Sequence, residues 1–242
     1  MQSKRIRLGI LTPSSNTALE PITSAMLSEL PHVSAHFARF TVTEITLSER
    51  ATGQFDTSRI LAAARQLADA RVDVIGWSGT SAGWLGFERD AALCRSIAKA
   101  TGIPATTSVL ALNELLERTG VRRLGLVTPY LDDVQQRIVR QYAQRGIDCV
   151  AEQHLGLRDN YSFAEVPDTQ LAALMRKTAQ ARPDAIVTFC TNLHAAHLAG
   201  PFEHATGIAA YDTVSTVVWK ALRMAGVDTR VLARWGKLFA MS

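Results

Sequence analysis

Three short segments of the sequence gather side chains that can bind or protonate a small anion. They are Pro13-Ser14-Ser15-Asn16-Thr17, Gly79-Thr80-Ser81 and Cys190-Thr191-Asn192. Each follows an apolar run typical of a β-strand, at the point where the chain is expected to enter a helix. Free backbone amides and the positive end of the helix dipole favour an anion at such a point. The hydroxyl, amide and thiol side chains there predict a binding site for a carboxylate.

Helix capping is a second explanation for these side chains, because Ser, Thr and Asn are preferred N-cap residues. Capping needs one such residue for each helix. The first segment supplies four in succession, from Ser14 to Thr17, and the other two segments supply more. We therefore expect the three segments to hold a ligand and not only to cap helices.

Cys190 is the cysteine best placed for chemistry. It follows an apolar strand and is expected to open a helix, where the pKa of a thiol can fall and a thiolate becomes available. Cys94 lies in an amphipathic helical pattern and Cys149 in a strand pattern, so both are expected to be small buried side chains. The three cysteines have neither CxxC nor CxxxC spacing, and we expect no disulfide framework and no zinc site.

The motifs of the chain indicate no cofactor. His194 and His197 share one face of the helix expected after Cys190, but two histidines without a third ligand do not define a metal site. The chain has no GxxxxGK sequence, and the glycines around Gly79 do not fit GxGxxG. We therefore expect a site that uses neither a metal nor a nucleotide cofactor.

The elements that position these segments occur twice in the chain, which is the sign of an internal duplication. Residues 7–13 return as 123–129, residues 70–78 return as 181–189, and residues 100–104 return as 205–209. The three matches follow one another in the same order. They indicate two copies of one structural unit.

Each copy alternates short β-rich apolar runs with stretches of helical spacing, which indicates α/β structure with a parallel sheet. Strands are predicted at 5–11, 34–41, 72–77 and 103–106 in the first copy and at 123–127, 148–154, 185–189 and 208–211 in the second. Helices are predicted at 58–70, 87–101, 132–144, 169–181 and 214–225.

The predicted fold is therefore a pair of pseudo-symmetric, internally duplicated α/β domains that face a central cleft. The first domain is expected to comprise residues 1–117 together with about 215–242, and the second residues 118–214. Parallel α/β sheets collect their functional loops at the carboxyl ends of the strands. This rule brings the polar segments of both copies to the same cleft.

Composition and charge narrow the class of protein. The chain has 242 residues, of which 47% are hydrophobic and 20% charged, so it has the composition of a folded globular protein. Its apolar runs are far shorter than the roughly 20 residues of a membrane-spanning helix, and no signal peptide is evident, so we expect a cytoplasmic protein. The net charge of +4 is scattered along the chain, which argues against nucleic-acid binding.

The duplicated α/β pattern, the PSSNT segment, the Thr80-Ser81 turn and the Cys190-Thr191-Asn192 turn resemble the aspartate/glutamate racemase superfamily. Within it, the sequence is most similar to the branch of arylmalonate decarboxylases and maleate isomerases. The similarity spans nearly the whole chain and includes residues 128–134 and 236–239.

The residues in the two duplicated turns decide which activity the resemblance implies. Racemases of the superfamily carry one cysteine in each turn, whereas this chain has Gly79 in the first turn and Cys190 in the second. Arylmalonate decarboxylases share the glycine and the single cysteine. The resemblance thus implies a cofactor-independent lyase acting on a small malonate-like carboxylate, with Cys190 as proton donor.

The resemblance also implies roles for individual residues. An oxyanion hole for the carboxylate and the enediolate would be formed by Thr80, Ser81, Tyr130 and the backbone amide of Thr191. The residues expected to contact the substrate are Pro13, Ser14, Ser15, Asn16, Gly79, Thr191, Asn192 and Asn160. Trp77, Trp84 and Phe87 are near enough to the first turn to supply an aromatic wall, although core packing is expected for at least one of them.

Two other functions stay open at this point. The polar residues Ser14, Ser15, Asn16 and Asn192 resemble the isomerase-like branch, which implies a maleate cis-trans isomerase or a racemase in which the first cysteine is replaced. The third alternative is a carboxylate-binding protein without turnover. In each case the expected partner is a small carboxylate, and the resemblance implies a homo-oligomer.

Overall fold

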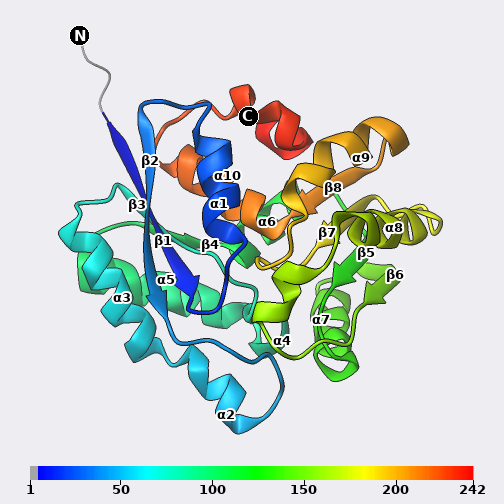
Figure 1. Cartoon of the computed structure of the whole chain (residues 1–242), viewed down its shortest axis with the longest axis horizontal. Coiled ribbons are helices and arrows are strands. Elements are labelled where there is room, and N and C mark those ends of the chain that lie inside the picture. The colour runs from blue at the N-terminus through cyan, green and yellow to red at the C-terminus, as the bar shows by residue number, and fades with distance from the viewer. Residues whose placement is uncertain (1–4, 242) are drawn as a thin grey trace.

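The computed structural model describes residues 5–241 and contains two four-stranded parallel sheets, which lie side by side in Figure 1. The strand orders are β2-β1-β3-β4 and β6-β5-β7-β8. The strands are β1 (Ile6–Pro13), β2 (Val33–Phe40), β3 (Val74–Trp77), β4 (Ala105–Thr107), β5 (Arg123–Thr128), β6 (Asp148–His154), β7 (Ala185–Thr188) and β8 (Ala209–Asp212). The predicted fold class, two duplicated α/β domains with parallel sheets, is confirmed.

Helices connect the parallel strands. The α-helices are α1 (Leu19–Leu27), α2 (Glu49–Thr52), α3 (Thr57–Asp69), α4 (Ala82–Leu85), α5 (Phe87–Thr101), α6 (Ser108–Arg118), α7 (Asp132–Gln144), α8 (Asp168–Ala179), α9 (Ala199–Thr206) and α10 (Thr213–Met224). Short 3-10 helices are η1 (Gly53–Phe55), η2 (Tyr161–Glu165), η3 (Ala196–Leu198), η4 (Arg230–Trp235) and η5 (Lys237–Ala240).

The duplication extends to details of the backbone. Arg71 and Arg182, which occupy equivalent positions before β3 and β7, have positive φ angles of 51° and 49°. The carboxylates of Asp73 and Asp184 each accept a backbone hydrogen bond of 2.8 Å, from the start of β1 and of β5 respectively. Two strained residues and two matching hydrogen bonds therefore support a common origin for the two halves.

Helices pack on the first sheet from both halves of the chain. α3 and α5 pack together and contact β1, β2 and β4, and α1 packs against β2. α10 packs against α6, β3 and β4, and it approaches Gly76 so closely that a Cβ atom there would lie 2.8 Å from Val217. The following η4 and η5 contact α9 and β8 of the second sheet. The end of the chain thus connects the two halves, and the domain boundaries stay a prediction.

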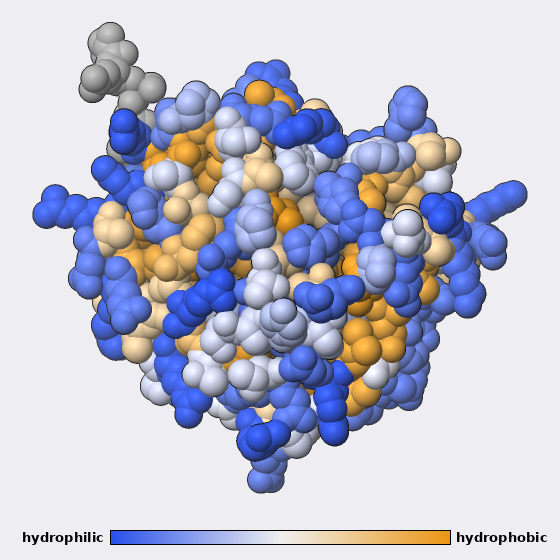
Figure 2. Space-filling view, in the orientation of Figure 1, coloured by the Kyte–Doolittle hydropathy of each residue, from blue (hydrophilic) through white to orange (hydrophobic). Residues whose placement is uncertain are grey.

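The surface carries both polar and apolar side chains. Figure 2 shows hydrophilic residues around most of the rim of the face viewed, with smaller hydrophobic areas between them. No helix in the part of the chain from residue 5 to residue 241 is long and apolar enough to cross a membrane.

Candidate active site

The carboxyl ends of the strands from both sheets enclose one small cavity, here called the central cavity. Its volume is about 20 Å³, which is enough for about one water molecule. Its lining residues are Pro13, Val42, Ile45, Phe55, Trp77, Gly79, Thr80, Ser81, Trp84, Tyr130, Asn160, Cys190 and Thr191. The loops after β1, β3, β5 and β7 therefore meet, as the duplicated topology predicts.

Unpaired backbone amides from two turns border this cavity. The N–H groups of Gly79, Thr80 and Ser81 donate to no residue in the described part of the chain, and neither do those of Cys190 and Thr191. All five residues are buried. Because buried amides are nearly always hydrogen-bonded, the two turns form an arrangement suited to an anion.

Tyr130 connects the two turns. Its hydroxyl lies 2.7 Å from the Thr80 hydroxyl, and its side chain also hydrogen-bonds the thiol of Cys190. Burial, followed by the neighbouring Cys190, raises the pKa of Tyr130 well above its usual value. The phenol therefore stays protonated and can donate a hydrogen bond.

Cys190 is buried and holds its proton. Burial raises the pKa of its thiol to about 12, although hydrogen bonds from Tyr130 and from the backbone of Asn192 act in the opposite direction. The sequence predicted a lowered pKa at a helix start, and that prediction is wrong. Residues 191–195 form a turn, and α9 begins only at Ala199, so no helix dipole acts on the sulfur.

Gly79 occupies the position equivalent to Cys190, and its lack of a side chain has a clear reason. The indole of Trp77 lies against it, so a Cβ atom on residue 79 would come within 3.0 Å of three indole atoms. Trp77 is 1% exposed and packs against Phe40 in a tilted arrangement with ring centroids 4.9 Å apart. The space that a first-turn side chain would need is therefore filled by a held tryptophan.

The serines of the first predicted segment contact protein rather than the cavity. The hydroxyls of Ser14 and Ser15 both donate to the carbonyl of Val42, at 3.3 and 2.6 Å. The Ser14 hydroxyl also accepts a bond of 3.1 Å from the amide of Val42. These bonds attach the loop after β1 to the chain that follows β2.

The two asparagines Asn16 and Asn192 also form structural contacts. Asn16 lies before α1 and accepts from the amides of Ala18 and Leu19 at the start of this helix, both at 3.0 Å. Asn192 accepts from the amides of Thr17 and Ala18, at 3.0 and 3.1 Å, and donates to the Asn160 carbonyl. Asn192 thereby attaches the second turn to the loop of the first copy.

Sequence-predicted residues thus fall into two groups. Those that line the central cavity are Pro13, Gly79, Thr80, Ser81, Tyr130, Asn160, Cys190 and Thr191. Those that the structure places outside it are Ser14, Ser15, Asn16 and Asn192. Asn160 belongs to the first group and donates to the Ser15 hydroxyl at 2.8 Å. Whether any of them contacts a substrate stays a prediction.

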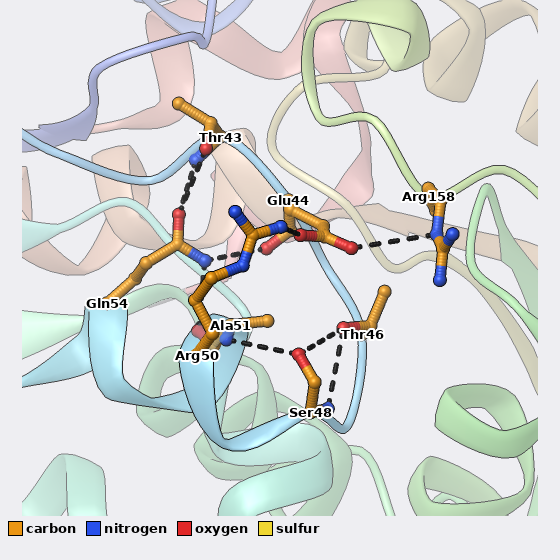
Figure 3. Close-up of polar contacts among 8 residues, drawn as sticks. All are labelled: Thr43, Glu44, Thr46, Ser48, Arg50, Ala51, Gln54 and Arg158. Carbon is orange, nitrogen blue, oxygen red and sulfur yellow. Dashed lines mark hydrogen bonds and ion pairs between the residues drawn. The ribbon is translucent and has the colours of Figure 1, made fainter.

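Residues 41–56, here called the cover segment, close the cavity and were not predicted to do so. The segment carries the apolar side chains of Val42, Ile45 and Phe55 to the lining. Figure 3 shows how Gln54 holds it together, accepting from the Thr43 amide at 2.7 Å and donating to the carbonyl of Glu44 at 3.0 Å. No sequence motif marks this segment, because its contacts are made by ordinary polar residues.

The cover segment is attached to the second half of the chain. The Glu44 carboxylate pairs with Arg50 of the same segment and lies 3.6 Å from Arg158 (Figure 3). The amide of Ile45 donates to the Arg158 carbonyl at 2.9 Å, and Glu44 forms an antiparallel bridge with Asp159. Both domains therefore contribute to closing the cavity.

Two of the three aromatic residues suggested for a pocket wall do line the cavity. Trp77 and Trp84 are lining residues, whereas Phe87 packs in the core with its ring 5.2 Å from that of Tyr142. Trp84 also packs edge-on against Tyr130, and its indole N–H has no hydrogen-bond partner among the described residues. The indole N–H of this lining residue is therefore an unused donor.

The histidines near the second turn lie outside the cavity. The His197 ring pairs at the surface with Asp168, at 2.7 Å, and His194 is not a lining residue. Within residues 5–241, no three His, Cys, Asp or Glu side chains are grouped so that they could hold a metal ion.

Known structures share the whole fold of this chain. A maleate isomerase variant from Pseudomonas putida S16, solved with maleate, superposes with a TM-score of 0.89 over 98% of both chains at 24% identity. A variant of arylmalonate decarboxylase in its liganded form gives a TM-score of 0.84 over 99% of this chain and 100% of that chain, at 23% identity. At these identities the likeness concerns the fold.

Sequence comparisons identify the family. Arylmalonate decarboxylase from Bordetella bronchiseptica is 30% identical over 179 residues, which cover 73% of this chain and 75% of that protein. Maleate isomerase from Geobacillus stearothermophilus is 23% identical over 242 residues, covering 95% of each. The sequence model described as arylmalonate decarboxylase matches residues 9–239. The chain therefore belongs to the arylmalonate decarboxylase family.

Proposed function

We propose that the protein is a decarboxylase that removes one carboxylate from a small α-substituted malonate and protonates the resulting carbon with Cys190. The bond between the α-carbon and one carboxylate breaks, carbon dioxide leaves, and the electron pair remains as an enediolate. The Sγ–H proton of Cys190 then moves to the α-carbon. The thiolate left behind takes a proton from water, so the steps need only the substrate, water and groups of the chain.

The observation that carries this proposal is the contrast between Gly79 and Cys190. A two-base racemisation needs an acid and a base on opposite faces of the carbon. Trp77 fills the space over Gly79, so the first turn offers an apolar indole face and no thiol. A single proton donor is sufficient for decarboxylation, because the loss of carbon dioxide itself leaves the carbanion that has to be protonated.

The high pKa of Cys190 supports the role of an acid. With a pKa of about 12, the thiol is protonated throughout the neutral range and carries the proton that the enediolate needs. A thiolate that attacks a double bond would require the opposite shift. Tyr130, hydrogen-bonded to the sulfur, can stabilise the thiolate after the proton has left.

The unpaired amides support the binding of the carboxylate that stays. The N–H groups of Gly79, Thr80 and Ser81 and those of Cys190 and Thr191 can donate to its oxygens, together with the hydroxyl of Tyr130. Donors placed in advance stabilise the charge that develops on the enediolate. Because the central cavity holds only about 20 Å³, the cover segment has to shift to admit a malonate.

The names of the relatives support decarboxylation and also suggest the second candidate function. The Bordetella bronchiseptica relative at 30% identity is an arylmalonate decarboxylase, and the family model carries that description. Two relatives called maleate isomerase cover 95% and 94% of the chain, against 73% for the decarboxylase, which makes cis-trans isomerisation of maleate the second candidate.

The test is proton NMR in D₂O with phenylmalonate, methylmalonate and maleate. We expect phenylmalonate or methylmalonate to lose carbon dioxide and to gain one deuterium at the α-carbon. Cys190→Ala should lower kcat roughly 10²- to 10⁴-fold, the usual contribution of a positioned acid. Cys149→Ala, which removes a thiol from β6 and not from the cavity, is the matched control and should keep full activity.

Three results would contradict the proposal. A fully active Cys190→Ala enzyme would remove the proton-donor role. Conversion of maleate to fumarate without any decarboxylation would identify the isomerase. Stabilisation of the fold by these acids, with neither turnover nor deuterium exchange, would identify a carboxylate-binding protein.

A further inference from the structure

A second and larger cavity, here called the side pocket, lies next to the central cavity. Its volume is about 180 Å³, and it shares Phe55, Trp77 and Ser81 with the central cavity. Its other lining residues are Thr57, Ile60, Leu85, Arg89, Asp90, Ala92, Leu93 and Ser96, from α3, α4 and α5. A substrate bound at the two turns therefore has one neighbouring space into which a substituent can extend.

The size and walls of the side pocket suit one aromatic ring. A cavity of about 150 Å³ with apolar walls is known to bind benzene, so 180 Å³ accepts a ring with one substituent. The apolar walls are formed by Phe55, Ile60, Trp77, Leu85 and Leu93. Phe55 and Trp77 among these residues can pack edge-on or offset against a bound ring.

Asp90 is an acidic residue among those that line the side pocket. The residue is only 3% exposed, and its Oδ2 accepts a hydrogen bond from the Thr107 hydroxyl. Its Oδ1 accepts no hydrogen bond from any residue in the range 5–241. Oδ1 is therefore a free acceptor on a largely buried residue that lines the side pocket, so a ligand that brings a donor would gain a hydrogen bond to this carboxyl.

The carboxyl of Asp90 has only part of its capacity engaged by the fold. Thr107 caps α6 by accepting from the Leu110 amide at 3.0 Å, and it donates to Asp90 at the same time. Burial raises the pKa of Asp90 to about 7, and the bond from Thr107 acts in the opposite direction. Oδ1 can accept a ligand's hydrogen bond in either protonation state.

We propose that the side pocket binds the α-substituent of the substrate and selects an aromatic ring carrying a hydroxyl or amino group, which donates to Asp90. The inference rests on the proposed decarboxylation and names the substrate class more closely. Phe55 is half-buried on the cover segment and lines both cavities. Its side chain therefore has to move for a substituent to extend from the central cavity into the side pocket. Trp77 stays in place between Phe40 and Gly79.

The kinetic test compares (4-hydroxyphenyl)malonate with phenylmalonate. We expect the native enzyme to favour the hydroxylated compound roughly tenfold or more in kcat/KM, as one buried hydrogen bond to a carboxylate predicts. Asp90→Leu should bring the ratio close to one. Equal values for the native enzyme, or an unchanged ratio in Asp90→Leu, would overturn the inference.

A second variant keeps the test valid if Asp90→Leu does not fold. Ser96→Phe places a ring in the side pocket without removing a hydrogen bond, and it should lower kcat/KM for both aryl compounds much more than for methylmalonate. Arg95→Phe adds the same ring at the neighbouring exposed position and is the matched control. Equal losses for aryl and methyl substrates in Ser96→Phe would contradict the side pocket.

Direct binding separates this inference from the proposed function. Calorimetry with 4-hydroxyphenylacetate and phenylacetate measures the side pocket without any turnover. If no malonate reacts but the hydroxylated acid still binds about tenfold more tightly and loses that advantage in Asp90→Leu, the decarboxylation fails and the side pocket stands. If malonates react and the two acids bind equally in every variant, the side pocket fails alone.

Discussion

The turns after β3 and β7 are the same structure with different chemistry. Both follow a central strand of a four-stranded parallel sheet, yet one presents Gly79 and the other Cys190. The difference traces to the residue two positions earlier. Trp77 lies over Gly79, whereas the equivalent Thr188 is small and donates to Asp212 at 2.7 Å. In this chain the thiol thus stands in the turn where the residue two positions earlier leaves room for it.

The ends of the fourth strands, β4 and β8, also differ between the two copies, in which element carries the buried carboxyl. β4 ends at Thr107, which caps α6 and donates to Asp90. β8 ends at Asp212, which caps α10 and accepts from Thr188. Each copy therefore buries one carboxyl against one threonine but places the acid on a different element. In the first arrangement the carboxyl belongs to a residue that lines a cavity, the side pocket next to Trp77.

Removing the Tyr130 hydroxyl, which links the two turns, should have the largest effect on activity. Tyr130→Phe deletes the hydroxyl that contacts both Thr80 and Cys190. We expect kcat for decarboxylation to fall roughly 10²- to 10³-fold, as for the loss of one preorganised oxyanion donor.

Tyr142→Phe is the matched control for Tyr130→Phe. Tyr142 is also fully buried, but its hydroxyl has no partner among the described residues and it lies outside the central cavity. Steady-state kinetics should show no change in this control. A similar loss in both variants would mean that Tyr130 acts through the core and not through the turns.

Converting the first turn into the second should expose the role of Trp77. Gly79→Cys alone forces a Cβ against the indole, and we expect a loss of about 1–3 kcal/mol in unfolding free energy from overpacking. Combined with Trp77→Thr, the substitution should cost less than the sum of the two single changes, by about 1–3 kcal/mol.

Urea unfolding of the four proteins in this double-mutant cycle measures the coupling. Strict additivity would show that the indole does not exclude a side chain at residue 79, and the contrast between the turns would need another cause. The midpoint and the slope must both be compared, because a changed slope would indicate an altered unfolded state.

The sequence alone was sufficient for the framework of the fold. Every strand predicted from the repeat overlaps an observed strand, with shifts of at most two residues at either end, as in 72–77 against Val74–Trp77. Hydrophobic periodicity also located α3, α5 and α7. The loops that line the central cavity followed from the topology, because parallel strands end at one edge of each sheet.

What could not be predicted depends on contacts between distant residues. A helix was expected at Cys190, but the Asn192 side chain bonds to the backbone at Thr17 and holds the segment in a turn. Burial then raises the thiol pKa that a helix start would have lowered. The cover segment and the placement of Trp77 over Gly79 likewise arise from tertiary packing, which periodicity and turn motifs do not encode.

Trp84 offers the smallest and most specific test of the difference between the turns. It belongs to α4, which follows the first turn directly, whereas the second copy has a buried Ala195 at the equivalent position. Trp84→Phe keeps one six-membered aromatic ring and removes the pyrrole part of the indole with its unpaired N–H donor, on a residue that lines the central cavity. If that donor binds the substrate carboxylate, kcat/KM should fall about tenfold, the lower end of the range for one hydrogen bond to a charged group. Trp219→Phe is the control, because its indole N–H is also buried and unpaired among the described residues but lies in α10, away from the cavity. An unchanged kcat/KM in Trp84→Phe would show that this indole only packs against Tyr130, and that binding depends on the amides and hydroxyls which the two turns supply.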